Sequence, residues 1–152
     1  MKHLNIERKH KANPFPFKMK HSDHPILLFD GVCNLCNSSV QFFIKHDKKG
    51  RVKFAALQSE TGRDLLFKFE LDPDYFDSLV FIDKEKVYTH SSAVLRASKY
   101  LNGLYPLLQV FLIKPKFLRD PIYKWIGRNR YRWFGKQDAC MIPTPELKER
   151  FL

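Results

Sequence analysis

The feature that most constrains the fold is a short apolar segment that leads directly into two cysteines. Residues 26–29 read Ile-Leu-Leu-Phe, between Pro25 and the dipeptide Asp30-Gly31. A continuous apolar run of this length, bounded by turn residues, is typical of a strand that is buried on both faces of a sheet. We therefore predict a first strand over residues 26–30.

A helix is predicted immediately after this strand, over residues 33–48. Its apolar residues, Cys36, Val40 and Phe43, recur at helical spacing, and residues 48–50 (Lys-Lys-Gly) provide cations and a glycine at its end. Cys33 then lies at the helix N-terminus, where unpaired N–H groups and the helix dipole stabilise a thiolate. Such a position lowers a cysteine pKa from about 8.5 toward or below neutrality.

The rest of the chain continues the alternation of strands and helices. Alternating residues 51–56 predict a second strand, and Ser59 can cap a second helix that ends at Phe69. Apolar residues 79–82 and 86–88 flank the turn 83–85, and Ser91 or Ser92 can cap a helix through Leu101. The order βαβαββα predicts an α/β, thioredoxin-like fold.

Three regions follow from these patterns. Residues 1–25 are rich in Lys, His and Pro without a sustained period, which indicates a flexible basic arm. Residues 26–103 form the predicted thioredoxin-like core. Residues 104–152 form a helical extension packed on the core, with helical stretches at 105–113, 118–133 and 145–151, punctuated by Pro115, Pro121 and Pro143.

Charge is concentrated outside the core. The formal net charge is +11, yet residues 26–113 carry eleven Lys/Arg against ten Asp/Glu. Residues 114–136 carry eight Lys/Arg against Asp120 alone, and they interleave these with aromatic residues, as a nucleic-acid or anionic membrane surface does. We favour the simpler interpretation, in which this is a solvated basic helix face whose aromatic residues pack inward.

The chemistry of the chain is expected at Cys33, Cys36 and Asp30. Cys33 is the expected nucleophile, and Cys36, one helical turn further on, can resolve a mixed disulfide formed on Cys33. Asp30 can accept the proton of Cys36, directly or through water, or it can close an Asx turn with Gly31, and one side chain can do both. The pair Asn34-Leu35 between the cysteines does not distinguish a reductant from an oxidant or an isomerase.

The segment 28–36 resembles the signature of the DCC family of thiol-disulfide oxidoreductases, named for its Asp-x-x-Cys-x-x-Cys motif. Residues 91–95 resemble the family's capped helix after the hairpin, and residues 122–143 resemble its C-terminal signature. The resemblance covers residues 26–143 and implies a thioredoxin-like fold with Asp30, Cys33 and Cys36 as the site. One departure from thioredoxins at large is Asp77-Ser78, where a cis-proline usually faces the cysteines.

Two non-enzymatic functions are alternatives to a thiol-disulfide oxidoreductase. Cys33, Cys36 and Cys140 with His90 or His46 would make a Cys₃His zinc site in a metal-stabilised binding protein. Against zinc, Cys140 has no cysteine or histidine near it in sequence, and a buried structural role is its simplest interpretation. The second alternative is a basic module that binds nucleic acid or a membrane surface.

The remaining expectations concern location and partners. The N-terminal segment lacks an apolar stretch of signal-peptide length, and three cysteines fit a reducing compartment, so a cytoplasmic location is expected. The expected partners are a disulfide- or thiol-bearing substrate, protein or small molecule, and an external thiol reductant. No bound organic cofactor is implied.

Overall fold

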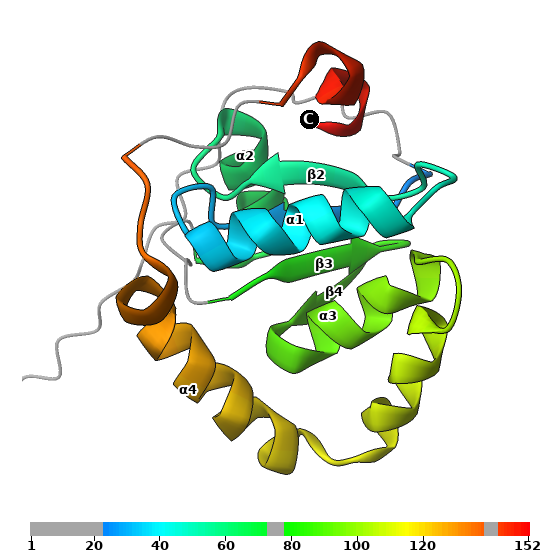
Figure 1. The fold of residues 1–152 in the computed structure, drawn as a ribbon, viewed down its shortest axis with the longest axis vertical. Coiled ribbons are helices and arrows are strands. Elements are labelled where there is room, and N and C mark those ends of the chain that lie inside the picture. The colour runs from blue at the N-terminus through cyan, green and yellow to red at the C-terminus, as the bar shows by residue number, and fades with distance from the viewer. Residues whose placement is uncertain (1–22, 73–77, 139–142) are drawn as a thin grey trace, which may run out of the picture.

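A four-stranded sheet with helices on both faces forms the centre of the computed structural model, which describes residues 23–72, 78–138 and 143–152 (Figure 1). The strand order is β2-β1-β3-β4, with β1 parallel to β2 and antiparallel to β3. The strands are β1 (Ile26–Phe29), β2 (Lys53–Ala56), β3 (Val80–Asp83) and β4 (Lys86–Thr89).

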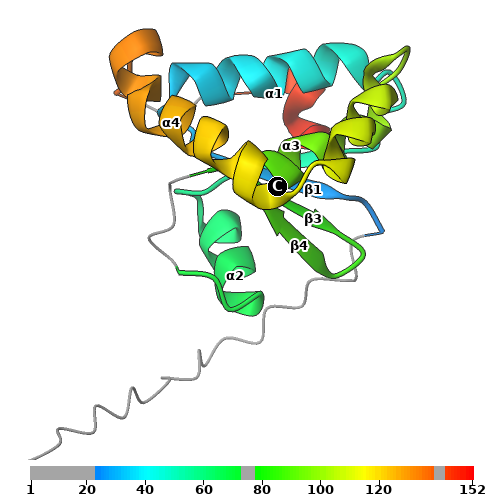
Figure 2. The same cartoon turned by 90° about the horizontal axis from the view of Figure 1, so that it is seen from below.

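The helices are α1 (Asn34–His46), α2 (Glu60–Lys68), α3 (His90–Ala97) and α4 (Lys116–Phe134), and the 3₁₀ segments are η1 (Ser98–Tyr100), η2 (Tyr105–Ile113) and η3 (Pro145–Arg150). Figure 2 shows α1 and α3 on one face of the sheet and α2 on the other. The structure is thus a mixed α/β fold of the predicted thioredoxin-like order, followed by C-terminal helices.

The predicted burial of the first strand is confirmed. All four residues of β1 are buried, and their side chains alternate between two core clusters, one on each face of the sheet. Leu27 and Phe29 pack with residues of α1 and α3, whereas Ile26 and Leu28 pack with residues of α2. The segment that ends at Asp30 is therefore held rigidly between two layers.

Local signals account for the turns and for the start of α2. Lys84 and Glu85 have φ of 48° and 66°, as a two-residue type I′ hairpin turn requires. The Ser59 hydroxyl accepts the Gly62 N–H at 3.0 Å, which is the predicted cap. A Cβ on Gly62 would lie 2.0 Å from the Ala56 carbonyl oxygen, so the close approach of α2 to β2 requires glycine there.

The predicted start of α3 is wrong in one respect. Thr89, not Ser91 or Ser92, is the N-cap residue, and its side chain makes no capping hydrogen bond. Ser91 and Ser92 lie in the first turn of α3. Their hydroxyls accept hydrogen bonds from the guanidinium of Arg119 in α4, at 3.1 and 3.4 Å. The backbone N–H of His90 instead donates to the Ser78 hydroxyl at 3.2 Å, so a residue outside the helix caps this end of α3.

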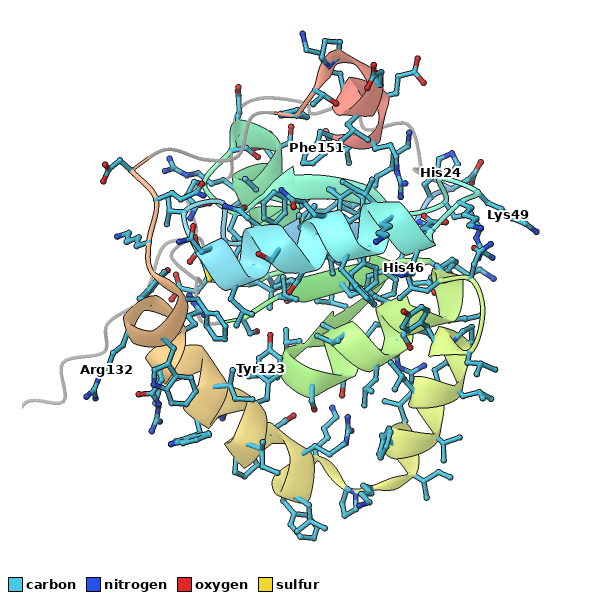
Figure 3. All side chains as sticks on the ribbon, viewed as in Figure 1. His24, His46, Lys49, Tyr123, Arg132 and Phe151 are labelled. Carbon is cyan, nitrogen blue, oxygen red and sulfur yellow. The ribbon has the colours of Figure 1, made fainter. Side chains whose placement is uncertain are left out.

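The C-terminal elements run around the core. Pro115 is the N-cap of α4, and Pro121 lies inside this helix, which continues through it to Phe134. The α4 helix contacts α1 and α3. Phe151, after η3, packs against Phe29 and Phe54 with ring centroids 6.2 and 5.7 Å apart (Figure 3).

The expectation that the aromatic residues of the basic segment pack inward is wrong for five of them. The exposed residues are Phe117 (73%), Trp125 (59%), Tyr131 (37%), Trp133 (47%) and Phe134 (48%). No helix within the described ranges is long and apolar enough to cross a membrane.

Candidate active site

Cys33 is the N-cap residue of α1, at the point where β1 gives way to this helix. Its Sγ accepts the backbone N–H of Cys36 at 3.3 Å, as a capping side chain does. Both thiols are free, Cys33 is fully buried and Cys36 is 8% exposed. The strand and the helix therefore hold a dithiol at a helix N-terminus, the arrangement that stabilises a thiolate.

The surroundings shift the pKa values of the two cysteines in opposite directions. Hydrogen bonding from the Cys36 thiol, aided by the Cys36 N–H and the charge of Arg130, lowers the pKa of Cys33 to about 6 against the effect of burial. The same thiol hydrogen bond and burial raise the pKa of Cys36 well above its ordinary value. Cys33 is thus the thiolate at neutral pH, and Cys36 keeps its proton.

Asp30 closes β1 and is 2% exposed, with hydrogen-bond donors on both carboxylate oxygens. Its Oδ1 accepts the Gln58 amide at 2.6 Å and the Val32 N–H at 3.2 Å, the latter being the predicted Asx turn. Its Oδ2 accepts the Arg130 guanidinium at 3.1 Å and the Tyr131 hydroxyl. Asp30 therefore joins the cysteine segment to the loop before α2 and to α4.

Arg130, Tyr131 and Gln58 are site residues that the sequence analysis did not single out. Arg130 is 6% exposed, and its charge lowers the pKa of Cys33. It lies 100 residues from Asp30 in sequence, so no local pattern connects the two. The available signal was the resemblance of residues 122–143 to a family signature, which marked this segment without assigning it to the site.

A short segment, residues 134–137, lies across the cysteine loop, and we call it the strap. It pairs with residues 32–34 like a short antiparallel strand, through a bridge between Cys33 and Lys136 and a hydrogen bond from the Gln137 N–H to the Val32 carbonyl at 2.7 Å. The Asn34 side-chain amide donates to the Phe134 carbonyl at 2.8 Å. The strap therefore covers the loop at Cys33, which is buried, whereas its neighbours Val32 and Asn34 are half-buried.

Cys36, rather than Cys33, lines a cavity of about 120 Å³ between α1, α3 and α4. Tyr123 and Arg130 line the same cavity from α4. The Tyr123 hydroxyl also accepts the Leu79 N–H at 3.2 Å, just before β3. A substrate chain that pairs with the Leu79 N–H must therefore displace Tyr123. Of the pair that stands in place of the usual cis-proline, Asp77 lies outside the described residues and Ser78 lines this cavity.

The described residues of the zinc alternative are not grouped as metal ligands. Cys140 lies outside the described residues. His46 ends α1, about 20 Å from the cysteines at 1.5 Å per residue, and its ring contacts Tyr105. His90 packs against Tyr123 with ring centroids 5.9 Å apart. Within the part of the chain that the structure describes, no three His, Cys, Asp or Glu residues are grouped as metal ligands.

The pKa of about 6 predicts the pH profile of Cys33 alkylation. A thiol acid with a lowered pKa gains its thiolate as the pH rises through that value, so the iodoacetamide rate should reach a plateau above about pH 7 and fall about tenfold between pH 7 and 5. Mass-spectrometric mapping assigns the label. Cys36→Ala removes the thiol hydrogen bond that contributes most to the lowered pKa of Cys33, so the midpoint of the alkylation rate should move to higher pH. An unchanged midpoint would show that Cys36 does not lower the pKa of Cys33.

The strap predicts an effect of Gly135→Ala on access to Cys33. Gly135 has φ 82° and ψ 172°, a region that only glycine adopts readily, and a Cβ there would lie 3.0 Å from the Asn34 amide nitrogen. We expect strain of about 1–3 kcal/mol, which would open the strap and raise the Cys33 alkylation rate about 5- to 150-fold. Gly103→Ala is the matched control, because Gly103 also has a positive φ, of 79°, with nothing within 4 Å. Equal effects of both substitutions would show that the strap does not cover Cys33.

The comparisons with known proteins identify the family of this chain. The DCC1-like thiol-disulfide oxidoreductase family matches residues 27–136, from β1 to the strap. The chain is 52% identical over 127 residues to the uncharacterized protein YuxK of Bacillus subtilis (strain 168), covering 84% of this chain and 93% of that protein. It is 44% identical over 119 residues to a chloroplastic DCC family protein of Arabidopsis thaliana, covering 78% of this chain and 69% of that protein. No solved structure gives a significant match. The chain therefore belongs to the DCC1-like thiol-disulfide oxidoreductase family.

Proposed function

We propose that this protein is a thiol-disulfide oxidoreductase in which Cys33 is the nucleophile and Cys36 the resolving thiol. The observation that carries the proposal is the position of the Cys33 sulfur at the N-terminus of α1, where it accepts the Cys36 N–H at 3.3 Å. A pKa of about 6 makes it largely a thiolate at pH 7. Membership of the family supports a redox role.

In the proposed reaction the Cys33 thiolate attacks a substrate disulfide. A sulfur–sulfur bond forms to Cys33 while the substrate bond breaks, and one substrate sulfur leaves as a thiolate that takes up a proton. Cys36 then loses its proton and attacks the Cys33 sulfur, which releases the second substrate thiol. The substrate disulfide is reduced to two thiols, and the cysteines are oxidised to a disulfide. An external dithiol returns two electrons, and the same steps run in reverse with a substrate dithiol.

The surrounding residues have supporting roles in this proposal. Arg130 favours the thiolate by its charge, and Asp30 holds Arg130 in place through their 3.1 Å contact. Because Cys33 is fully buried, the strap must move before a substrate disulfide reaches it. Asp30 can also receive the Cys36 proton through water, as the sequence suggests. A cytoplasmic location is part of the proposal, supported by the low cysteine content.

A thiol count on the purified full-length protein, across a graded series of glutathione redox buffers, tests the proposal. Two thiols should be lost and regained reversibly, with a single midpoint redox potential. Mass spectrometry should place the disulfide between Cys33 and Cys36. Cys140→Ser is the control variant and should give the same midpoint. A metal analysis accompanies the count. A disulfide to Cys140, or stoichiometric zinc released by thiol modification, would overturn the proposal in favour of the metal-stabilised alternative.

A further inference from the structure

Most of the large apolar side chains that are exposed in the described part of the chain lie on or next to η2 and α4. Of the seventeen large apolar side chains exposed among the described residues, fourteen lie between Leu104 and Phe134. Ile113 and Phe117, at the junction of η2 and α4, are 83% and 73% exposed. Single exposed apolar residues are common on soluble proteins, but a concentration of this kind marks an interaction surface.

The two sides of α4 have different neighbours. Tyr123, Ile126 and Arg130 line the cavity next to Cys36. Leu118, Ile122, Trp125 and Trp133 follow one another at intervals of four, three and eight residues, so they share another side of the helix. The two indole rings on that side contact each other, with centroids 4.9 Å apart. One side of α4 thus completes the redox site, and another presents exposed tryptophans.

A cationic row runs beside the apolar side of α4. Lys124, Arg128 and Arg132 are exposed and four residues apart, so they lie along one line on the helix. Figure 3 shows Arg132 pointing away from the body of the molecule, whereas Tyr123 points toward it. Arg130, by contrast, is bound to Asp30. The outward surface therefore combines Trp, Leu and Ile with Lys and Arg.

The η2 segment extends this surface. It reads Tyr-Pro-Leu-Leu-Gln-Val-Phe-Leu-Ile, carries no charge, has no buried residue, and is followed by Lys114 and Lys116. In Figures 1 and 2, η2 and α4 form two arms of a V that encloses α3. The exposed apolar and basic groups therefore belong to a single protruding structure.

We propose that the outward surface of η2 and α4 docks on an anionic lipid bilayer, with these elements lying in the plane of the interface. Trp, Leu and Ile would enter the boundary between headgroups and acyl chains, while Lys and Arg would pair with lipid phosphates. A second copy is disfavoured because it would bring two cationic surfaces together. Nucleic acid would neutralise the cations but would leave the Leu and Ile side chains uncovered.

Docking in this way goes beyond the proposed redox function and does not rest on it. It would bring Cys33 and Cys36 close to the bilayer, since α4 contacts α1 on one side and would contact lipid on the other. A helix is about 10 Å across, so the dithiol would lie roughly that far from the interface.

The tryptophans provide a direct test, because Trp125 and Trp133 are the two tryptophans of the whole chain. Full-length protein is mixed with vesicles of phosphatidylcholine alone or with added phosphatidylglycerol. We expect a blue shift of the emission and co-sedimentation with the anionic vesicles, and quenching by brominated acyl chains. A blue shift that depends on protein concentration without vesicles, together with a dimer in sedimentation, would overturn the proposal in favour of a second copy.

Matched charge variants separate docking from general electrostatic attraction. Lys124→Gln/Arg128→Gln/Arg132→Gln should weaken binding to anionic vesicles by about a hundredfold or more, at about fivefold per cation. Arg63→Gln/Lys68→Gln/Lys84→Gln removes the same charge from exposed residues of α2 and of the β3–β4 turn. Figure 2 shows α2 on the sheet face opposite to α1 and α3, so this variant should change binding little. Equal losses in both variants, or vesicle binding without quenching by brominated chains, would overturn the proposal. Tighter binding of single-stranded RNA than of anionic vesicles would also overturn it.

Discussion

Cys33→Ser is expected to reduce thiol-disulfide exchange to the background rate, a loss on the order of 10³-fold or more, without unfolding the protein. A serine hydroxyl at the N-cap position still accepts the Cys36 N–H, so α1 keeps its cap. It does not ionise near neutral pH and cannot form a disulfide. The rate is measured with a model disulfide and an external dithiol, and folding is checked by circular dichroism.

Cys36→Ser is the informative partner of this variant. Cys33 can still attack a disulfide, but no thiol resolves the product, so a mixed disulfide on Cys33 should accumulate and be visible by mass spectrometry. Cys140→Ser should retain full exchange. Exchange that survives in Cys33→Ser, or a mixed disulfide that forms on Cys36 in the wild-type protein, would reverse the assignment of nucleophile and resolving thiol.

Arg130→Met is expected to have the largest effect on stability among substitutions around the site. The Asp30 carboxylate, 2% exposed, would lose its cation, and breaking a buried pair from one side costs about 3–5 kcal/mol. The pKa of Cys33 should also rise, because the charge of Arg130 lowers it. Urea unfolding gives the free energy of unfolding, and the pH profile of Cys33 alkylation gives the pKa.

Arg150→Met is the matched control for this prediction. Arg150 binds the buried carboxylate of Asp47 at 2.7 Å, far along α1 from the cysteines, so its loss should lower stability and leave the Cys33 pKa unchanged. The double variant Asp30→Asn/Arg130→Met should recover part of the stability lost in Arg130→Met, since no buried charge is left alone. A loss below about 1 kcal/mol in Arg130→Met with an unchanged pH profile would contradict the role given to this pair.

The thioredoxin-like order could be predicted because its determinants are local. The apolar run of β1, the Ser59 cap and the hairpin turn each involve neighbouring residues. The first two are found as expected, and the turn predicted over 83–85 is found at 84–85. The α3 cap could not be predicted, because Ser91 and Ser92 contact Arg119 of a helix that lies elsewhere in the sequence. The sequence pattern near a helix start is the same whether a polar residue caps its own helix or binds a neighbouring helix.

The outward aromatic residues of α4 show a second limit of sequence patterns. Tyr123 faces the core side, whereas Trp125 and Trp133 face solvent, although all three are aromatic residues of one basic helix. Periodicity separates the sides of a helix but does not say which side meets the body when more than one is apolar. The position of α4 against α1 and α3 decides this.

The sequence by itself determined the central dithiol and the framework that holds it. A buried strand followed by a helix start places Cys33 at an N-terminus whatever else the chain does, because capping is local. Only the tertiary structure decided that Arg130 and Tyr131 meet Asp30, that the strap buries Cys33, and that the tryptophans face outward. These contacts join residues about 100 positions apart or depend on how a whole helix packs, and such pairings leave no periodic trace in the sequence.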